Sequence, residues 1–240
     1  MPSIDERKLI IREAAWNRLK AAGVVDGPVY GKIPDFHGAE QAAQRLAGLK
    51  EWAAARVVKV MPDRPQQPVR ELALREGKIL YMATPKLATD QPFIILDPTE
   101  LGDRVEQVVS SQSAMALGRG VEVSNLEPID LVVCGTVAVT ADGRRLGKGA
   151  GYADIEVALL TAAGLVGPNT LIATTVHDLQ TVDHTIPERD HDFGVDLIIT
   201  PTRVIRSNRR KRPASINWSE LSPDKVAAIP ALARRAEQRT

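Results

Sequence analysis

The chain has a single cysteine, almost no net charge and few aromatic residues. Its 240 residues include one cysteine, Cys134, so no disulfide can form within the chain. A single cysteine fits a protein of a reducing compartment. The 31 basic and 30 acidic residues give a net charge of +1, which excludes recruitment of nucleic acid or anionic membrane by bulk charge. Aromatic residues make up only 4%, so the core must consist mostly of Val, Ile, Leu and Ala.

Long hydrophobic runs are missing as well. No apolar stretch reaches the roughly 18 residues that span a bilayer, and residues 1–8, MPSIDERK, lack the apolar core of a signal peptide. We therefore expect a soluble cytoplasmic protein with no membrane partner. The sequence contains no convincing linker, which predicts a single domain over residues 1–240.

Apolar spacing predicts helices alternating with strands. Helices are expected at residues 3–22, 38–49, 69–75, 152–163 and from 223 onward, with a kink at Pro230, and strands at 57–60, 78–82, 93–96, 129–139, 171–176 and 197–200. Ser3 and Glu6 form a capping-box pattern at the first helix. The run at 129–139 is almost continuously apolar, as in a strand covered on both faces. This alternation predicts an α/β fold with a mostly parallel sheet.

The most informative segment is GRRLGKGAGYAD at residues 143–154, between that strand and a helix. Glycines allow a ligand to approach the backbone closely, and free amides before a helix form an anion site. Arg145 and Lys148 add cations for phosphate oxygens, and Asp154 in the first helical turn could hold Mg²⁺ beside a phosphate. The segment is not a Walker A motif, because no Ser or Thr follows Lys148. The alternative is a flexible connection in which Asp154 only complements the helix dipole.

This segment resembles the signature of the 5-formyltetrahydrofolate cyclo-ligase (methenyltetrahydrofolate synthetase) family. The family carries Arg-Leu-Gly, a glycine-rich stretch and Tyr-Tyr-Asp, and this chain has RLG at 145–147 and GAGYAD at 149–154. Further matches follow the family's order: Lys8 and Arg12 in Lys-x-x-x-Arg spacing, Gln180, Ile186-Pro187, His191-Asp192, residues 196–200, Pro213 and residues 216–218. The segments at 33–36, 58–60, 84–87 and 147–154 are most similar to the subgroup of methenyltetrahydrofolate synthetase domain-containing proteins.

The resemblance implies a fold and a reaction. The fold is three-layered, with a mostly parallel sheet flanked by helices, of the NagB/RpiA/CoA transferase-like type. The reaction closes 5-formyltetrahydrofolate, a reduced folate, to 5,10-methenyltetrahydrofolate with ATP and Mg²⁺. The formyl oxygen is a poor leaving group until it receives the γ-phosphoryl group, after which the neighbouring folate nitrogen can attack. Such transfer needs alignment and charge neutralisation more than covalent help from the protein.

The resemblance also implies residue roles. Lys148 and Arg145 are the expected catalytic residues, and Asp154 the expected Mg²⁺ ligand. ATP would be bound by Lys8, Arg12, Gly147, Gly149, Ala150, Gly151 and Tyr152. The Lys-x-x-x-Arg spacing places both early cations on one helix face; the alternative is that this face is solvated and binds nothing.

Three departures from the family keep other functions open. Ala153 replaces the second tyrosine, residues 61–65 (MPDRP) lack the family's substrate-reading glutamate, and the glycine core reads GAG. The first two departures concern residues that contact the folate substrate in the family. The chain could therefore be a non-catalytic relative that binds nucleotide or RNA with a retained phosphate site. A third hypothesis is a phosphosugar or acyl-CoA enzyme on the same type of sheet.

Three further features have two interpretations each. The repeat of His177, His184 and His191 among aspartates could bind zinc, but a loop with turn and cap hydrogen bonds explains it better. Cys134 in an apolar strand fits a core role rather than a nucleophile. A basic run without acids is either a solvated surface or a contact for phosphates or RNA; it consists of Arg203, Arg206, Arg209, Arg210, Lys211 and Arg212.

Overall fold

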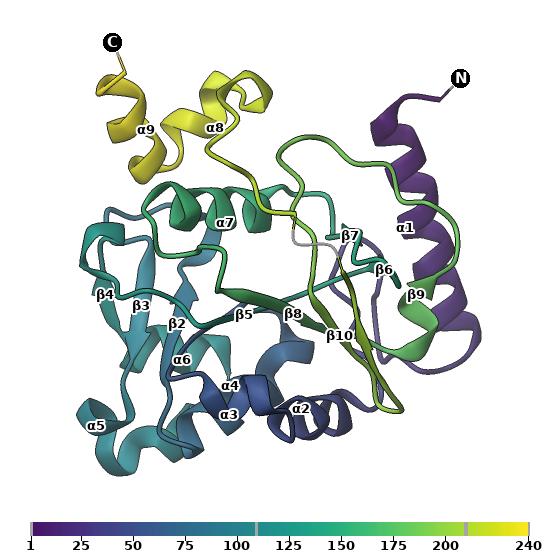
Figure 1. Ribbon diagram of the computed structural model, residues 1–240, viewed down its shortest axis with the longest axis horizontal. Coiled ribbons are helices and arrows are strands. Elements are labelled where there is room, and N and C mark those ends of the chain that lie inside the picture. Colours follow the sequence, from purple (N-terminus) through teal and green to yellow (C-terminus); the bar gives the residue numbers. More distant parts are fainter. Residues whose placement is uncertain (1, 109, 209–210, 240) are drawn as a thin grey trace.

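The protein is built on an eight-stranded sheet, shown in Figure 1 by a computed structural model that describes residues 2–108, 110–208 and 211–239. The strand order is β11-β10-β8-β5-β1-β2-β3-β4. The strands are β1 Val57–Val60, β2 Ile79–Ala83, β3 Phe93–Leu96, β4 Arg119–Val121, β5 Leu131–Cys134, β8 Leu171–Thr175, β10 Leu197–Ile199 and β11 Val204–Arg206. The run from β10 to β2 is parallel, and β11, β3 and β4 pair antiparallel at the two edges. The predicted α/β fold with a mostly parallel sheet is confirmed.

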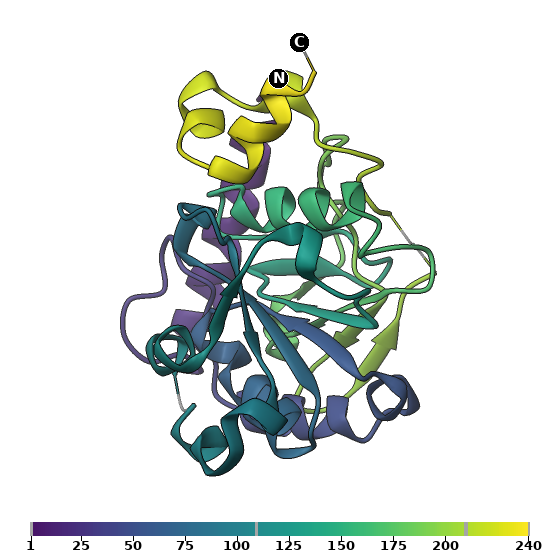
Figure 2. The ribbon, with the colours of Figure 1, turned by 90° about the vertical axis from the view of Figure 1, so that its left-hand side faces the viewer.

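Helices cover both faces of this sheet and make the fold three-layered. In Figure 1, α7 lies above the sheet and α2 to α4 lie below it, and Figure 2 shows the same order after a 90° turn. The lower helices are α2 Ala39–Ala47, α3 Lys50–Ala54, α4 Gln67–Arg75, α5 Pro98–Leu101 and α6 Ser111–Leu117, and the upper ones are α7 Tyr152–Ala162, α8 Pro223–Ala227 and α9 Pro230–Glu237. Short 3₁₀ helices are η1 Arg64–Gln66, η2 Pro85–Leu87, η3 Gly102–Gln107, η4 Val123–Asn125, η5 Asp178–Gln180 and η6 Trp218–Glu220.

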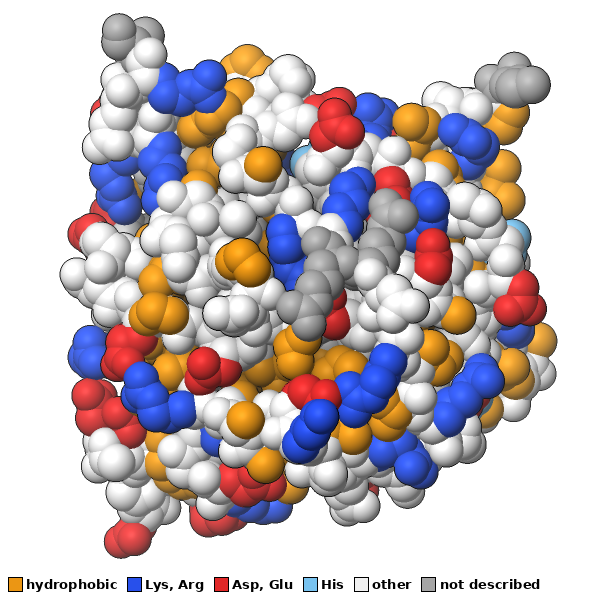
Figure 3. All heavy atoms as spheres, in the orientation of Figure 1, with side chains coloured by type: hydrophobic (Ala, Val, Ile, Leu, Met, Phe, Trp, Pro, Cys, Tyr) orange, Lys and Arg blue, Asp and Glu red, His pale blue; other side chains and the backbone are white. Residues whose placement is uncertain are grey.

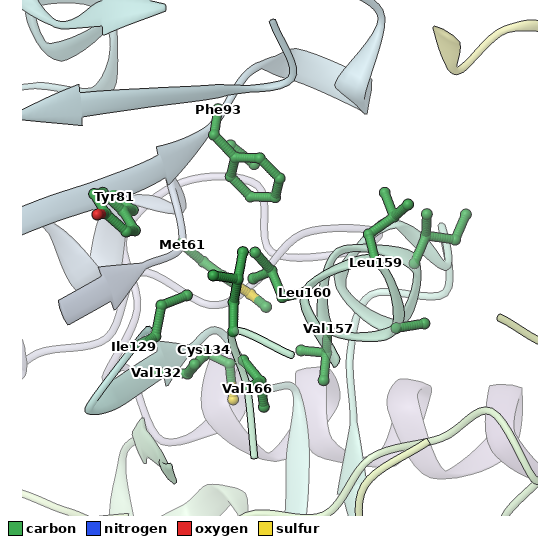
Figure 4. Close-up of a cluster of buried hydrophobic side chains, with 14 of the residues drawn as sticks. Met61, Tyr81, Phe93, Ile129, Val132, Cys134, Val157, Leu159, Leu160 and Val166 are labelled. Atoms are coloured by element: carbon green, nitrogen blue, oxygen red, sulfur yellow. The ribbon is translucent and has the colours of Figure 1, made fainter. Parts of the chain in front are cut away.

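Each face of the sheet carries its own hydrophobic cluster, because successive side chains of a strand point to opposite faces. Val57 and Val132 belong to the cluster under α7, whereas Val58 and Val133 belong to the cluster over α2 and α4. Figure 4 shows the α7 cluster, in which helix side chains such as Leu159 gather with side chains from the strands. Burial on both faces explains why the central strands are continuously apolar.

A second, three-stranded sheet lies beside the first. It consists of β7 Arg145–Leu146, β6 Ala138–Thr140 and β9 Thr181–Val182, and α1 Ile4–Ala21 packs against it (Figure 1). The predicted capping box opens α1: the Ser3 hydroxyl accepts from Glu6 N–H at 3.2 Å, and the Ser3 N–H donates to the Glu6 carboxylate at 2.7 Å. This small sheet brings α1 next to the glycine-rich turn that follows β7.

The prediction of one strand over residues 129–139 is wrong. β5 ends at Cys134, and β6 begins at Ala138 in the other sheet. The Thr136 carbonyl between them accepts from the Gln180 side-chain amide at 2.7 Å instead of a neighbouring strand. Apolar composition predicts that a segment is buried, but it does not show where the backbone changes direction.

The C-terminal region also differs from the prediction. Ser222 caps the helix that starts at Pro223, as expected, since its hydroxyl accepts from Lys225 N–H at 3.2 Å. However, Pro230 begins a separate helix rather than kinking a continuous one, in keeping with the preference of proline for the first helical turn. Several short elements were not predicted, namely α3, α5, α6, β4, β7, β9 and β11. In the part of the chain that the structure describes, no helix combines the length and apolarity of a membrane span.

We expect Leu159→Ala to lower the free energy of unfolding by about 2–5 kcal/mol, because the side chain of Leu159 on α7 is fully buried against the sheet and its truncation leaves a cavity. Leu9→Ala is the matched control, since Leu9 is 48% exposed on α1, and it should change stability by less than about 0.5 kcal/mol. Urea denaturation of both variants measures the difference; equal losses would contradict the assignment of this core.

Candidate functional site

A cavity of about 660 Å³ opens at the carboxyl ends of three parallel strands, and its volume is typical of small-molecule sites. Asp63 follows β1, residues 84–86 follow β2, and Gly135 follows β5, and all of them line the cavity. The chain leaves β1 toward β2 on one side and later returns to β5 on the other side. Ligands bind at such a reversal of strand order in open α/β sheets.

The glycine-rich turn forms one wall of this cavity. Residues 147–151 all line it, between β7 and α7. Gly149 and Gly151 have φ of +99° and +75°, a conformation that glycine adopts without strain. Among the described residues, the backbone N–H groups of residues 148–151 have no hydrogen-bond acceptor. The turn is therefore open, with free amides at the amino end of an 11-residue helix.

Helix α1 brings Lys8 and Arg12 to the same cavity, as the spacing predicted. Lys8 is 6% exposed, and its ammonium donates to the Asp192 carboxylate. Arg12 Nε donates to the Gly147 carbonyl at 2.7 Å and so fastens α1 to the glycine-rich turn. A solvated helix face, the alternative considered from the sequence, does not describe these two side chains.

Arg12 has no carboxylate within ion-pair distance among the described residues. Burial lowers the pKa of its guanidinium, and repulsion from Arg145 lowers it further. An arginine nevertheless keeps its charge at neutral pH. Asp192, Asp154 and Asp5 act on Arg12 only at longer range, so a bound anion could be its direct ion-pair partner.

Arg145 is buried and fixed by protein contacts. Its Nη1 donates to the Gly135 carbonyl at 2.9 Å, its Nη2 lies 3.3 Å from Asp154 Oδ1, and its guanidinium stacks 4.2 Å from the centre of the Phe193 ring. Its buried Nε has no acceptor. These contacts make Arg145 part of the cavity wall, with one donor still unpaired.

The other two expected polar residues also line the cavity. Lys148 Nζ lies 3.0 Å from Asp63 Oδ1, with 42% of its side chain exposed. Asp154 sits in the first turn of α7 beside Arg145. The described residues contain no group of three or more His, Cys, Asp and Glu side chains that could hold a metal ion. Mg²⁺ at Asp154 would therefore take its remaining ligands from phosphate and water, as it commonly does.

Three residues of the site were not predicted from the sequence. Lys225 of α8 donates to the Ala150 carbonyl at 2.6 Å and lies 4.4 Å above the centre of the Tyr152 ring. Lys59 and Glu156 form a buried ion pair, and Glu156 lines the cavity. The lysine inside the apolar run at 57–60 was a signal for this pair, whereas no sequence pattern pointed to Lys225.

Two loops at the cavity have fixed shapes. Buried Arg70 donates to the carbonyls of Met61 at 2.8 Å and Asp63 at 3.0 Å, and burial lowers its pKa to about 10. After β2, Lys86 and Leu87 have φ of 57° and 56°, which is unusual for residues other than glycine. Such strained backbone is concentrated at binding sites.

The histidine-rich loop forms the turn and cap bonds that the sequence favoured. His177 Nδ1 accepts from the Leu179 N–H at 3.1 Å, and Asp178 accepts from the Thr200 and Thr202 hydroxyls at 2.7 Å each. Cys134 is fully buried, and burial raises the pKa of its thiol. Cys134 does not line the cavity, whereas His191 at the end of the histidine-rich loop does.

The basic run is largely paired with acids from elsewhere in the chain. Arg209 and Arg210 lie outside the described residues. The four described cations each have an acidic neighbour: Arg203 with Asp178, Arg206 with Glu51, Lys211 with Glu188, and Arg212 with Asp196. On the face shown in Figure 3, basic and acidic side chains are interspersed rather than gathered into one basic field.

The sequence profile of the 5-formyltetrahydrofolate cyclo-ligase family matches residues 6–201. The chain belongs to this family. The match includes Lys8, Arg12 and the glycine-rich turn, and it ends before Lys225. The resemblance inferred from residues 143–154 is thereby confirmed.

Known relatives support this assignment. The chain is 40% identical over 238 residues to a methenyltetrahydrofolate synthase domain-containing protein of Mus musculus, covering 96% of this chain and 63% of that protein. The corresponding Homo sapiens protein is 38% identical over 237 residues, covering 96% and 61%. The chain thus spans less than two thirds of the length of these relatives. The NMR structure of Aquifex aeolicus 5,10-methenyltetrahydrofolate synthetase has a TM-score of 0.54 at 17% identity, covering 89% of this chain and 99% of that one, which shows a shared fold.

We expect Asp192→Asn to change how stability depends on pH. Burial raises the pKa of Asp192, but hydrogen bonds from Lys8 and the Arg189 N–H outweigh it, so the folded-state pKa is below 3.8. A lowered pKa stabilises the fold above about pH 4, and this contribution is lost as pH falls through the folded-state pKa. The free energy of unfolding of the variant at pH 7 should therefore be lower by about 1–3 kcal/mol. It should also fall less steeply than that of the wild type as the pH is lowered.

Urea denaturation at pH 7, 5 and 3 measures this effect. Asp190→Asn is the matched control, because Asp190 is exposed in the same loop, and its curve should follow that of the wild type. An unchanged acid sensitivity in Asp192→Asn would show that the contact with Lys8 does not stabilise the fold.

Proposed function

We propose that this protein uses ATP and Mg²⁺ to close 5-formyltetrahydrofolate to 5,10-methenyltetrahydrofolate. The observation that carries the proposal is the row of free amides at residues 148–151 beside Arg12, whose guanidinium has no ion-pair partner among the described residues, in a cavity at the carboxyl ends of the parallel strands. Membership of the cyclo-ligase family supports the reaction. The names of the relatives support a folate substrate.

The phosphate groups of ATP would lie against the glycine-rich turn. The amino end of α7 carries about half a positive charge, and its amides point at a bound anion. Lys8, Arg12 and Lys148 would surround the phosphates with cations that reach them as hydrogen-bond donors. Tyr152 at the start of α7 would pack on the nucleotide or position the substrate.

Asp154 would hold Mg²⁺, which supplies positive charge to the phosphate oxygens. ATP supplies the phosphoryl group that turns the formyl oxygen into a leaving group. The chain's own contribution is charge and orientation: Lys148 and Arg145 would stabilise the charge that develops on the transferring group. Arg145 suits this role, because its contacts with the Gly135 carbonyl and Asp154 fix its guanidinium in the cavity wall in advance.

The folate would occupy the other end of the cavity, where Met61, Pro62 and Pro85 offer apolar surface. A non-catalytic relative that binds only nucleotide remains the competing function, because Ala153 and residues 61–65 depart from the family pattern on this side. The pairing of the basic run with acids gives RNA binding no support from those side chains.

Ligand-dependent thermal shifts separate these functions, since stabilisation follows ligand affinity. We expect Mg·ATP and 5-formyltetrahydrofolate each to raise Tm, and both together to produce methenyltetrahydrofolate, followed by its absorbance. A shift with Mg·ATP but none with the folate, and no product, would favour the non-catalytic function.

We expect Arg12→Met to weaken Mg·ATP binding roughly ten- to a hundredfold, because charge-assisted hydrogen bonds contribute about 1.5–3 kcal/mol. Isothermal titration calorimetry measures the Kd. Arg7→Met is the matched control on α1, because Arg7 is exposed and does not line the main cavity. Equal affinities of the two variants would rule out a phosphate contact by Arg12.

We expect Asp154→Asn to raise about tenfold the Mg²⁺ concentration that gives half-maximal stabilisation by ATP, because an amide is a weaker ligand for a hard cation. Asp224→Asn serves as control, since Asp224 lies in the first turn of another helix, α8. A Mg²⁺ requirement that is the same in all three proteins would remove Asp154 from the metal site.

A further inference from the structure

The central strand β1 carries a charged residue on a face that is otherwise apolar. Alternation places Val57, Lys59 and Met61 on the α7 face of the sheet. Lys59 is completely buried. A buried ammonium is costly unless a countercharge accompanies it, so its presence in the middle of the sheet calls for a specific partner.

That partner is Glu156, in the second turn of α7. Its Oε2 accepts a hydrogen bond from Lys59 Nζ. Its Oε1 accepts none from any described residue. Glu156 is 6% exposed and lines the cavity. One oxygen of this carboxylate is therefore committed to Lys59, and the other is available to a ligand at the inner end of the cavity.

The neighbouring helix position leaves room for such a ligand. Ala153 lies three residues before Glu156, so the two side chains share one face of α7. Ala153 also lines the cavity. A large side chain at position 153 would cover the carboxylate, whereas alanine leaves it accessible.

The residues at this end of the cavity restrict the chemical class of ligand that can bind there. An ionised carboxylate only accepts hydrogen bonds, so the group that it recognises must present N–H or O–H donors. Met61, Pro62 and Pro85 surround the ligand space with apolar surface that suits a flat ring. A pterin ring fits this description, because its 2-amino group and N3–H form a donor edge on a flat heterocycle.

We propose that Glu156, positioned by Lys59, is the specificity-determining residue that binds the 2-amino and N3–H edge of the folate substrate. The inference rests on the proposed function and adds the contact by which the protein recognises the substrate. Lys59 is a positioning residue: it holds the carboxylate in place but does not line the cavity.

The test measures two affinities in the same variants. We expect Glu156→Gln, which replaces one acceptor oxygen by a donor group, to raise the Kd for 5-formyltetrahydrofolate at least tenfold and to leave the Kd for Mg·ATP within twofold of the wild type. A double variant, Lys59→Met with Glu156→Leu, removes both charges together, because apolar replacement of a whole buried pair is commonly tolerated. The double variant should lose as much folate affinity as Glu156→Gln. Its Tm without ligand shows whether it is folded.

A substrate analogue distinguishes direct contact from an indirect effect. The wild type should bind 2-desamino-2-methyl-5-formyltetrahydrofolate at least tenfold more weakly than the parent folate. In Glu156→Gln this preference should fall below about threefold, as expected when the two changes remove the same interaction. A full preference in the variant would overturn the inference.

Asp196→Asn is the matched control, because Asp196 is a buried carboxylate paired with Arg212 and does not line the cavity. It should leave both affinities unchanged. Folate binding that survives in the double variant would assign the pair a purely structural role and overturn the inference, with the proposed function intact. Failure of the wild type to bind the folate would overturn both.

Discussion

The site depends on the place where the chain leaves the main sheet at Gly135. A Cβ at this position would lie 2.9 Å from Asp63 Oδ2 and 3.1 Å from Gln66 Oε1, so a larger residue would displace these two side chains of the segment that follows β1. From there the chain forms the small sheet, the glycine-rich turn and α7. The Arg145 side chain then donates a hydrogen bond to the Gly135 carbonyl, which links β7 to the end of β5. The cavity is thus bounded by segments that meet at Gly135, through the side chains of the loop after β1 and through Arg145.

Charge in the cavity is arranged in pairs rather than as a basic field. Lys8 pairs with Asp192, Arg145 with Asp154, and Lys148 with Asp63. This arrangement keeps the cations in place before any ligand arrives, which reduces the reorganisation that binding requires. Among the described residues, Arg12 and Lys86 line the cavity without an ion pair, and Arg12 lies beside the free amides of the turn. Under the proposed function, selectivity for an anion would come from a small number of donors without an ion-pair partner, while net charge would contribute little.

The sequence predicted the α/β fold and the capped first helix, since these follow from local patterns of alternation and capping. The roles of the residues around the glycine-rich turn stay predictions, although the structure brings those residues to one cavity. It failed for residues 129–139, where apolar composition could not reveal that the strand divides between two sheets. It also missed the pairing of Lys59 with Glu156, which are 97 residues apart. The basic run looked like a candidate contact for phosphates until the fold supplied acids such as Glu51 and Asp196.

The sequence by itself determined most of the longer helices and strands, and which residue types are available for binding an anion, because both depend on neighbours in the chain. Only the tertiary structure decided which of those charges are neutralised and which remain available. Coulombic pairing and burial depend on distances between segments such as α1, the turn after β7 and α8, and contacts over more than a hundred residues leave no pattern in a single sequence.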